Sequence, residues 1–296
     1  MNVLVITGDK RFKEGSSRFE LQRSAVDSLV ALFWGRGVLF PSIPNKNFDV
    51  VTVQDPFWRG LFGVYVASCI GARLNVQVHT DLSAHSFYRK LLARIVLRKA
   101  NSVRVVSERI KKQVEETGVK SRIHVLPVYM DTDVFKSVER VSHDGKNILW
   151  IGRLEKEKDP EMAITVFKKI YKKESLARLV ILGEGNLRRE LEKKAQGLPI
   201  EFPGWSDTKS YLARADVVIS TSPYEGFGAS IVEALLAGVP VVSLDIGIAK
   251  EAGAIIATPQ KLAEIVLDIL KRDEQGTLKL ALPNKEEWVS RWKESL

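Results

Sequence analysis

A glycine-containing loop in the second half of the chain lies between two carboxylates. Glu225 precedes Gly226 and Gly228, and Glu233 follows eight residues after Glu225. A short apolar run ends at Ser220, so the loop joins a predicted buried strand to a helix that follows at once. The backbone N–H groups and the positive dipole end at such a helix N-terminus suit a phosphate group. Carboxylates accept hydrogen bonds from sugar hydroxyls. The loop and the helix start at 225–233 therefore predict a binding site for a sugar nucleotide.

The same spacing also has a purely structural interpretation. Ser230 and Glu233 have the S-x-x-E spacing of a capping box, which predicts Ser230 as the helix N-cap. Gly238 and Pro240 predict the end of this helix. In that interpretation Glu233 only closes the capping box, and Glu225 is a solvated loop residue. Local spacing leaves both interpretations open.

Two basic residues follow an earlier predicted strand. Gly152 and Arg153 come directly after it, and Lys158 lies five residues beyond the arginine, so both side chains could reach one diphosphate. Arginine can bind phosphate through two parallel N–H groups, and lysine adds a compact charge. Basic residues on a loop are usually only solvated.

The loop at residues 183–185 begins a G-x-G-x-x-G pattern, but Arg188 occupies its last position, which makes a dinucleotide site a weak prediction.

Together these segments resemble one enzyme family. The run E-G-F-G-A-S-I-V-E-A-L-L-A-G-V-P-V-V at 225–242 is similar to the E-x7-E element of the retaining glycosyltransferases of family 4, which have the GT-B fold. Further matches are I-L-W-I-G-R-L at 148–154, L-V-I-L-G-E-G at 179–185, F-P-G at 202–204 and A-D-V at 215–217. The resemblance covers the second half almost continuously and the first half more loosely.

The resemblance implies a role for each matching residue. Arg153, Lys158 and the amides around Gly228 would stabilise the charge on the leaving diphosphate. Glu233 would hold the ribose hydroxyls, and Glu225 the hexose hydroxyls. The acceptor would attack on the face that the diphosphate leaves, and a phosphate oxygen would take its proton. The predicted catalytic residues are His79, Arg153, Lys158 and Glu225, and the predicted donor-binding residues are Gly15, Gly152, Arg153, Lys158, Glu225, Gly226, Phe227, Gly228, Ala229, Ser230 and Glu233.

Three features of the first half and the linker are interpreted through the same family. His79 ends a predicted strand and matches a family histidine beside the transferred sugar, although a lone histidine is more often structural. Gly15 lies in G-S-S, which resembles the family's glycine loop in a shifted, longer form and predicts a phosphate or acceptor contact. Asp131 and Asp133 have D-x-D spacing, which arises readily by chance. We interpret them as linker residues and predict no metal site and no cofactor, with the nucleoside-diphosphate sugar as co-substrate.

The composition is that of a globular protein. Hydrophobic residues make up 45% and charged residues 27% of the 296 residues. Cys69 is the single cysteine, so no disulfide can form within the chain, and its apolar neighbours predict a buried, inert thiol. The longest apolar stretch, at 61–72, is too short to span a bilayer. We expect a cytoplasmic location, and peripheral attachment to the inner face of the membrane stays open.

The net charge of +9 is concentrated in the first half. Residues 86–122 carry 11 Lys and Arg against three Asp and Glu, which predicts a polyanionic partner on that side. Nucleic acid is not expected, because the basic segment lacks the interleaved aromatic residues of a stacking platform. The helical run at 86–99 mixes basic residues with Phe87, Leu91, Leu92, Ile95 and Val96. Such a helix packs on a sheet with a solvated basic face, or lies on an anionic membrane surface.

Strands and helices alternate in both halves, which predicts doubly wound parallel sheets of the α/β class. We expect the GT-B arrangement, in which two Rossmann-like domains face a cleft and a C-terminal helix packs back on the first domain. The predicted boundaries are 1–140 for a reduced acceptor-side domain, 146–275 for the nucleotide-sugar domain and 276–296 for the returning helix, which contains Trp288 and Trp292. Within the first domain we predict a helix over 17–34 and only a loop or stunted strand over 37–47.

The predicted function is therefore transfer of a sugar from UDP- or GDP-hexose to an acceptor glycan or lipid-linked acceptor, with retention of configuration. Such an enzyme would serve cell-surface glycan or glycolipid assembly. Two alternatives stay open: a sugar-nucleotide epimerase of the same fold, and a non-catalytic basic protein that binds nucleic acid.

Overall fold

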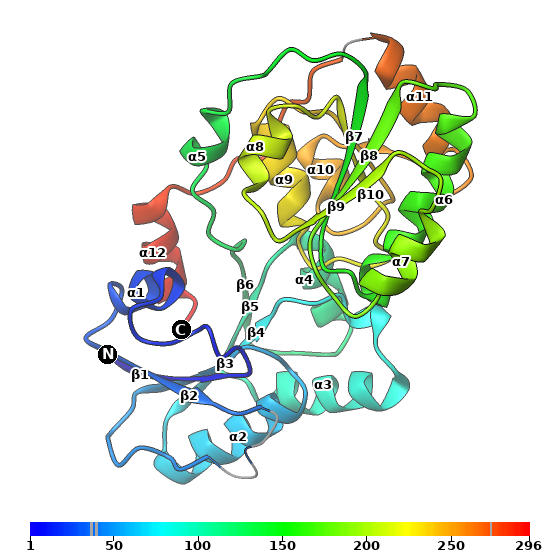
Figure 1. Ribbon diagram of the computed structural model, residues 1–296. Helices are drawn as coiled ribbons and strands as arrows, with labels where there is room; N and C mark the ends of the chain where they lie inside the picture. Colours follow the sequence, from blue (N-terminus) through cyan, green and yellow to red (C-terminus); the bar gives the residue numbers. More distant parts are fainter. Residues whose placement is uncertain (36–37, 39–40, 273) are drawn as a thin grey trace. The chain divides into compact units, whose positions relative to one another are not determined.

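The computed structural model describes residues 1–35, 38, 41–272 and 274–296 and divides into two compact units. Unit 1 contains residues 1–129 together with 282–296, and unit 2 contains residues 130–281. Each unit is built on one six-stranded sheet whose strands all pair in parallel. The predicted α/β class is therefore confirmed, and each unit is described below by itself (Figure 1).

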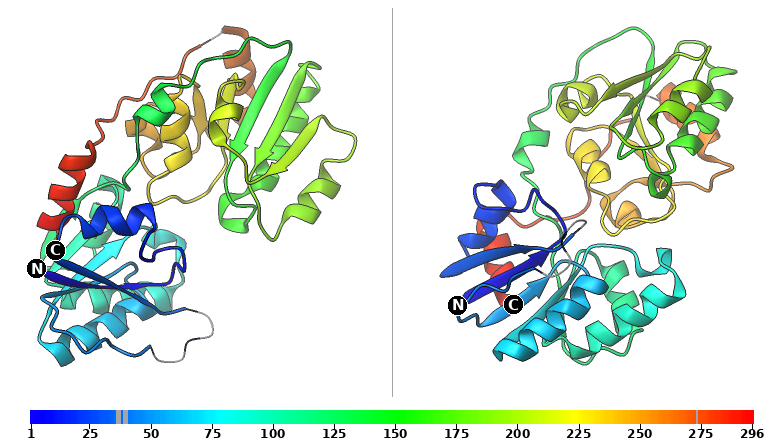
Figure 2. Two further views of the ribbon diagram at one scale, coloured as in Figure 1. Left: turned by 60° about the vertical axis from the view of Figure 1, so that its left-hand side comes forward. Right: turned by 60° about the horizontal axis from the view of Figure 1, so that its bottom comes forward.

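The sheet of unit 1 has the strand order β2-β1-β3-β4-β5-β6. Helices α1 and α12 cover one of its faces, and α2 and α3 cover the other (Figures 1 and 2). The elements are β1 (Asn2–Thr7), α1 (Ser17–Arg23), β2 (Ser28–Phe33), β3 (Val50–Val53), α2 (Trp58–Ile70), β4 (Arg73–Val78), the 3₁₀ turn η1 (Leu82–Ala84), α3 (Phe87–Lys99), β5 (Ser102–Val105), α4 (Glu108–Glu115), β6 (Arg122–Val125) and α12 (Lys285–Glu294).

The predicted helix over residues 17–34 is wrong. The helix ends at Arg23, and the apolar run that follows forms strand β2, which pairs in parallel with β1 over its whole length. A short apolar run cannot be assigned to helix or strand by periodicity alone, and here the open edge of β1 provides a hydrogen-bonding partner. The first domain is therefore fuller than predicted. The stunted strand that we predicted over 37–47 lies partly outside the described residues, and residues 41–47 form no strand.

Helix α12 returns to unit 1, as predicted for the C-terminal helix. Asn284 caps its N-terminus by accepting a hydrogen bond from the Glu287 amide at 2.8 Å. Trp288 and Trp292 are buried, with their rings stacked 6.4 Å apart, in a core shared with α1 and β1. The indole Nε1 of Trp288 donates to the Pro127 carbonyl at 2.8 Å. Apolar burial on this scale holds the last helix on unit 1.

Helix α2 is apolar on all sides, and its glycines face the core. A Cβ atom on Gly63 would lie 2.3 Å from Val53 Cγ1, and one on Gly60 would lie 2.7 Å from Val96 Cγ1. This close approach to β3 and α3 turns the large residues outward, and Cys69 is exposed with them. The predicted buried thiol is therefore wrong, because an apolar run on both faces gives no information about which side is covered.

The sheet of unit 2 has the strand order β12-β11-β10-β7-β8-β9. Helices α6 and α11 pack together on one face around Phe167, Ile170 and Val266, and α9 and α10 lie on the other (Figure 1). Two features were not predicted, the short strand β12 and a turn of helix, α5, in the predicted linker. The elements are α5 (Asp133–Lys136), β7 (Lys146–Ile151), the 3₁₀ turn η2 (Lys156–Lys158), α6 (Pro160–Tyr171), β8 (Ala177–Leu182), α7 (Arg188–Lys194), β9 (Ile200–Gly204), α8 (Thr208–Leu212), β10 (Val217–Ser220), α9 (Ala229–Leu236), β11 (Val241–Ser243), α10 (Ala249–Ala252), β12 (Ile255–Ile256) and α11 (Leu262–Arg272).

Candidate active site

Strand order identifies one position at the carboxyl end of each sheet as the expected ligand site. In open parallel sheets, ligands bind beyond the carboxyl ends of the strands where the strand order reverses. This point lies between β7 and β10 in unit 2 and between β1 and β3 in unit 1. Apart from Gly15, the predicted donor residues follow β7 and β10 in the chain, and they therefore come from the two strands that flank the reversal in unit 2.

The start of α9 differs from the predicted capping box. The helix begins at Ala229, and Gly228 is its N-cap, with φ of +104° and no side-chain capping hydrogen bond. Ser230 is therefore not the cap, because the tight loop needs a left-handed residue at position 228 and glycine adopts that conformation at little cost. The first N–H groups of a helix have no partner within it. In α9 no side chain caps them, and Glu233 is not committed to a capping box.

Lys158 and Glu225 form an ion pair, although 67 residues separate them in the chain. Both side chains are largely buried, with 22% and 15% of their surface exposed. The Ser222 hydroxyl donates a second hydrogen bond to Glu225 Oε1 at 3.1 Å. The pair therefore joins the loop after β7 to the loop after β10 and fixes a cation and a carboxylate beside each other.

A buried threonine holds these two loops in register. The Thr221 hydroxyl donates to the Asp159 carbonyl at 2.7 Å and accepts a hydrogen bond from the Trp150 indole at 2.9 Å. Asp159 has a left-handed φ of +44°, and its carboxylate caps α6 by accepting from the Met162 amide at 3.1 Å. Sequence reasoning gave no role to Thr221 or to Trp150, although Trp150 lies in the matching segment 148–154, and together they position Lys158.

Arg153 is the more exposed of the two predicted phosphate-binding cations. Its side chain is 59% exposed and pairs with Glu157, four residues on. Gly152 donates its N–H to the Leu182 carbonyl at 3.0 Å, which fixes the backbone of this loop against β8. Arg153 and Lys158 each have a glutamate partner of their own, so both cations are neutralised within unit 2.

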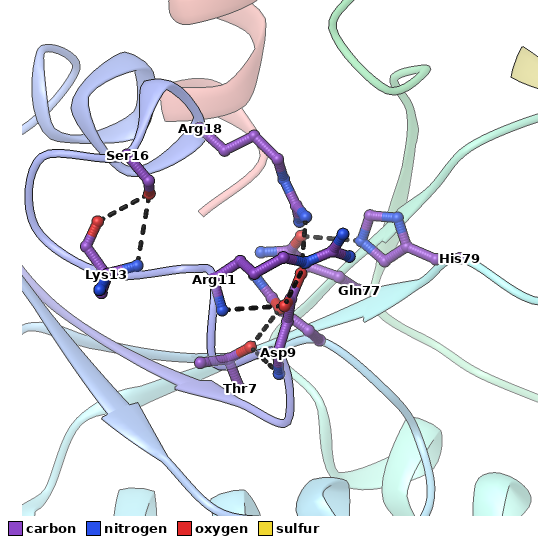
Figure 3. Close-up of polar contacts among 9 residues, drawn as sticks. Thr7, Asp9, Arg11, Lys13, Ser16, Arg18, Gln77 and His79 are labelled. Atoms are coloured by element: carbon purple, nitrogen blue, oxygen red, sulfur yellow. Dashed lines mark hydrogen bonds and ion pairs between the residues drawn. The ribbon is translucent and has the colours of Figure 1, made fainter. Parts of the chain in front are cut away.

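His79 follows β4 in unit 1, and its tautomer is defined by its neighbours. Its Nε2 lies 3.1 Å from Gln77 Oε1 (Figure 3). Gln77 Oε1 also accepts a hydrogen bond from Arg104 Nη1 at 2.9 Å. Burial, and secondarily the charge of Arg104, lower the pKa of His79 to about 3. The ring is therefore neutral at pH 7, with the proton on Nε2 and a lone pair on Nδ1.

The remaining predicted residues lie on loops or, in the case of Asp133, at the start of α5. Gly15 has a φ of +81°, and its N–H donates to Glu20 Oε1 at 2.8 Å, so its part in ligand binding stays a prediction. Asp131 and Asp133 lie at the start of unit 2, and the Asp133 carboxylate pairs with Lys136. Across the described parts of the chain, no group of three or more His, Cys, Asp or Glu side chains is arranged to hold a metal ion.

A chain of buried polar side chains crosses the sheet of unit 1, and sequence reasoning did not identify it. Gln77 Nε2 donates to Thr52 Oγ1 at 2.9 Å, which donates to Asn75 Oδ1 at 2.6 Å. Asn75 Nδ2 donates to the Ser295 carbonyl, at the end of α12, at 2.7 Å. The sequence does contain a signal, because polar residues inside strands that are covered on both faces must find partners.

Similar solved structures define the class of protein. HepE from Anabaena, solved in complex with UDP-glucose, covers 99% of this chain and 94% of its own, with a TM-score of 0.75 and 16% identity. Sucrose-phosphate synthase from Thermosynechococcus elongatus covers 100% and 94%, with a TM-score of 0.73 and 15% identity. Two α/β units of this kind, each with a parallel sheet, form the GT-B fold. At such low sequence identities the structural similarity shows the fold and no more.

The sequence identifies the family within that class. Residues 12–134 match Glycosyltransferase Family 4, and residues 145–272 match Glycosyl transferases group 1. The chain belongs to the glycosyltransferases of family 4.

Two relatives with named activities match parts of the chain. A GDP-mannose-dependent alpha-(1-6)-phosphatidylinositol dimannoside mannosyltransferase from Mycobacterium tuberculosis is 37% identical over 134 residues, which are 42% of this chain and 35% of the relative. An alpha-monoglucosyldiacylglycerol synthase from Streptococcus pneumoniae is 25% identical over 228 residues, which are 67% of this chain and 52% of the relative. The matches therefore span about a third and about half of the length of these relatives.

Proposed function

We propose that this protein transfers a hexose from a nucleoside diphosphate to a hydroxyl of an acceptor, with retention of configuration at the anomeric carbon. The observation that carries the proposal is the Lys158–Glu225 pair at the carboxyl end of the unit 2 sheet, whose glutamate lies in the loop that leads to the uncapped start of α9. A cation and free amides suit a diphosphate, and a carboxylate suits sugar hydroxyls. One named relative depends on GDP-mannose and the other synthesises a monoglucosyldiacylglycerol, in keeping with this donor and acceptor class.

In the proposed reaction, the bond from the anomeric carbon to the diphosphate breaks and a bond to the acceptor oxygen forms. Arg153, Lys158 and the amides of residues 228–230 would stabilise the negative charge that develops on the leaving diphosphate. The acceptor proton would pass to a phosphate oxygen, so that no protein nucleophile is needed. The Glu225 carboxylate would accept hydrogen bonds from the hexose hydroxyls, and Glu233 from the ribose.

Turnover of radiolabelled UDP- and GDP-hexoses, with and without EDTA, tests this proposal directly. We expect release of the nucleoside diphosphate with the sugar transferred, at an undiminished rate in EDTA, because cations and amides of the protein take the place of a metal. Conversion of the donor into its epimer, with no transfer, would instead favour the epimerase alternative. Binding of nucleic acid without turnover of any sugar nucleotide would favour the non-catalytic alternative.

Glu233 makes the donor site sensitive to pH. Burial raises the pKa of its carboxyl above the ordinary value. Ribose hydroxyls that donate to the carboxylate favour its ionised form, so bound donor lowers this pKa. The contribution of Glu233 to affinity is then complete above its pKa in the free protein and is lost as the pH falls through that value.

We therefore expect the affinity for UDP, measured by calorimetry between pH 7.5 and pH 5, to fall more steeply in the native protein than in Glu233→Gln. Titration of the UDP phosphate affects both proteins equally and cancels in the comparison. Parallel curves for the two proteins would remove Glu233 from the ribose site.

We also propose that unit 1 rests on an anionic membrane surface through α2 and α3. Packing on the sheet accounts for Ala93, Val96 and Leu97 of α3, which are buried. It does not account for Phe87, Leu91 and Ile95, which recur at i, i+4 spacing and are exposed, Phe87 by 74%. Helix α2 adds further exposed apolar side chains next to α3, namely Trp58, Leu61 and Tyr65.

Aromatic and aliphatic side chains beside basic residues are typical of interfacial helices. Within the described residues, no helix is long and apolar enough to cross a bilayer. Each basic residue near an anionic surface contributes on the order of 1 kcal/mol, so several together give reversible, salt-sensitive attachment. Such attachment would bring the enzyme to a lipid-linked acceptor.

Co-sedimentation with vesicles tests the membrane proposal. We expect binding to phosphatidylglycerol vesicles, little binding to phosphatidylcholine, and loss of binding in the triple variant Lys90→Gln, Arg94→Gln, Lys99→Gln. The matched control removes the same charge from α6 of unit 2 and its C-cap, in Lys168→Gln, Lys169→Gln, Lys172→Gln, and should bind normally. Equal loss of binding in both triple variants, or no binding to anionic vesicles at low salt, would contradict the membrane proposal. The concentrated positive charge of unit 1 would then require another partner.

A further inference from the structure

Unit 1 contains a cavity of about 360 Å³ at the carboxyl end of its sheet. Its walls include Asp9 and Gln54, which follow the two strands that flank the reversal of strand order, and also Gln22, His79, Arg104 and Trp288. All of these residues belong to unit 1. The volume is within the range of small-molecule sites. The position is the one where a parallel sheet binds its ligand.

Two amide side chains in the cavity wall each have an atom without a hydrogen-bond partner. Gln22, from α1, is only 4% exposed, and its Oε1 has no donor. Gln54 Oε1 accepts from the Thr7 hydroxyl at 2.6 Å, which leaves its buried Nε2 without an acceptor. Buried polar atoms in native proteins are nearly always paired. The cavity therefore lacks one donor for Gln22 and one acceptor for Gln54, and a ligand with both could satisfy them.

Arg104 is a buried cation without a carboxylate. It is 2% exposed, and its hydrogen bonds go to Gln77 Oε1 and to the carbonyls of Leu126 and Pro127. Among the described residues, no acidic side chain pairs with it, and its guanidinium lies 5.2 Å from the centre of the Trp288 ring. Burial lowers the pKa of Arg104 to about 9, so it stays charged at neutral pH. A buried charge of this kind is costly unless an anion compensates for it.

The acidic residue in the cavity wall is already neutralised. Asp9 accepts hydrogen bonds from Arg11 Nε at 3.1 Å and from Arg18 Nη1 at 3.2 Å (Figure 3). Burial raises the pKa of Asp9, but these contacts, above all the one with Arg11, together hold it below its ordinary value. His79 is neutral and offers a lone pair on Nδ1. The cavity wall therefore has a net positive charge, with Arg104 uncompensated.

We propose that this cavity binds the acceptor through a phosphate group carried on a polyhydroxylated moiety. The assignment of the ligand as acceptor rests on the proposed transfer function. Arg104 and Gln54 Nε2 would donate to the phosphate oxygens, and Gln22 Oε1 and His79 Nδ1 would accept from hydroxyls. The phosphate could belong to a lipid headgroup or to a free sugar or polyol phosphate, because the recognising chemistry is the same.

The test is a calorimetric titration of the full chain in saturating UDP, which keeps the probes out of the donor site. The probes are glucose 6-phosphate and glycerol 3-phosphate, each compared with its unphosphorylated parent, and dihexanoylphosphatidylglycerol compared with dihexanoylglycerol, which lacks the phosphate, all below any micellar concentration. We expect at least one phosphorylated probe to bind about tenfold or more tightly than its partner, the range for hydrogen bonds to charged groups. Preference for the lipid probe would identify a headgroup, and preference for a sugar or polyol phosphate would identify a free acceptor.

Three variants locate this binding. Arg104→Gln and Gln54→Leu should each weaken it about tenfold or more, and the second keeps the test valid if the first does not fold. The control Arg73→Gln removes an exposed arginine at the opposite end of β4 and should bind normally. Equal binding of phosphorylated and neutral probes, or unchanged binding in both cavity variants, would overturn the inference.

UDP affinity, measured separately, distinguishes this inference from the proposed function. Loss of the phosphate preference with normal UDP binding and turnover would overturn the cavity assignment alone. Absence of both UDP binding and sugar transfer would overturn the proposed function, and with it the assignment of the cavity ligand as an acceptor.

Discussion

Replacing Lys158 with Ala is expected to lower the turnover of sugar nucleotide by about 100-fold or more, which is the effect of removing a single electrostatic donor to a developing negative charge. The ammonium group lies at the end of the loop after β7, in an ion pair with Glu225. On donor binding it would exchange part of that contact for the diphosphate. Its loss would weaken stabilisation of the leaving group and also release Glu225 from its fixed position, so both kcat and KM should change.

Arg153→Ala should lower turnover by a similar factor, but with less effect on the position of Glu225, because Arg153 is more exposed and pairs with Glu157 instead. The matched control is Lys156→Ala, which removes the same charge from the same 3₁₀ turn, two residues before Lys158. Melting temperatures measured by circular dichroism should stay close to that of the native protein in all three variants. Unchanged turnover in both Lys158→Ala and Arg153→Ala would contradict the assignment of this loop to the diphosphate.

Most of the strands and helices of unit 2 could be predicted from the sequence because their signals are local. Strand β10 ends at Ser220, where the sequence predicts the end of a buried strand, and β8 is likewise a largely apolar run that ends at a glycine. The chain after Arg23 could not be assigned in this way. Its apolar run fits a helix or a strand, and the choice depends on the free edge of β1, which is a tertiary contact.

The candidate site could likewise be predicted only in part, because its residues belong to local motifs but their contacts depend on tertiary structure. Motifs identified Lys158 and Glu225, but not the contact between them, because that contact depends on Thr221 and on a left-handed Asp159. The capping box at Ser230 was wrong because loop geometry overrode a local side-chain preference. From the sequence, Arg104 could be identified only as one of the basic residues of 86–122. A charged residue in a strand gives no sign of its burial until the neighbouring strands are known.

Gly183→Ala is expected to be the most damaging single substitution in unit 2, lowering stability by about 3 kcal/mol or more through combined steric conflict and backbone strain. A Cβ atom at this position would lie 1.8 Å from the Gly152 carbonyl oxygen, and the residue has a φ of +143°. The Gly183 N–H donates to the Gly204 carbonyl at 2.9 Å, so the backbone is held on both sides and has little room to retreat.

The loop that would be displaced to admit this methyl group carries Gly152 and Arg153, so any folded fraction of Gly183→Ala should also bind UDP more weakly. Gly197→Ala is the matched control, because Gly197 has a left-handed φ of +77° but open space around it. This substitution should lower the free energy of unfolding by only about 1 kcal/mol, the cost of a left-handed backbone conformation in a residue with a Cβ atom. Thermal unfolding followed by circular dichroism compares the two, and a Gly183→Ala protein as stable as Gly197→Ala would show that the glycine loops after β7 and β8 can separate. If UDP affinity then also stayed unchanged, the close backbone contact of these loops would have no part in positioning Arg153.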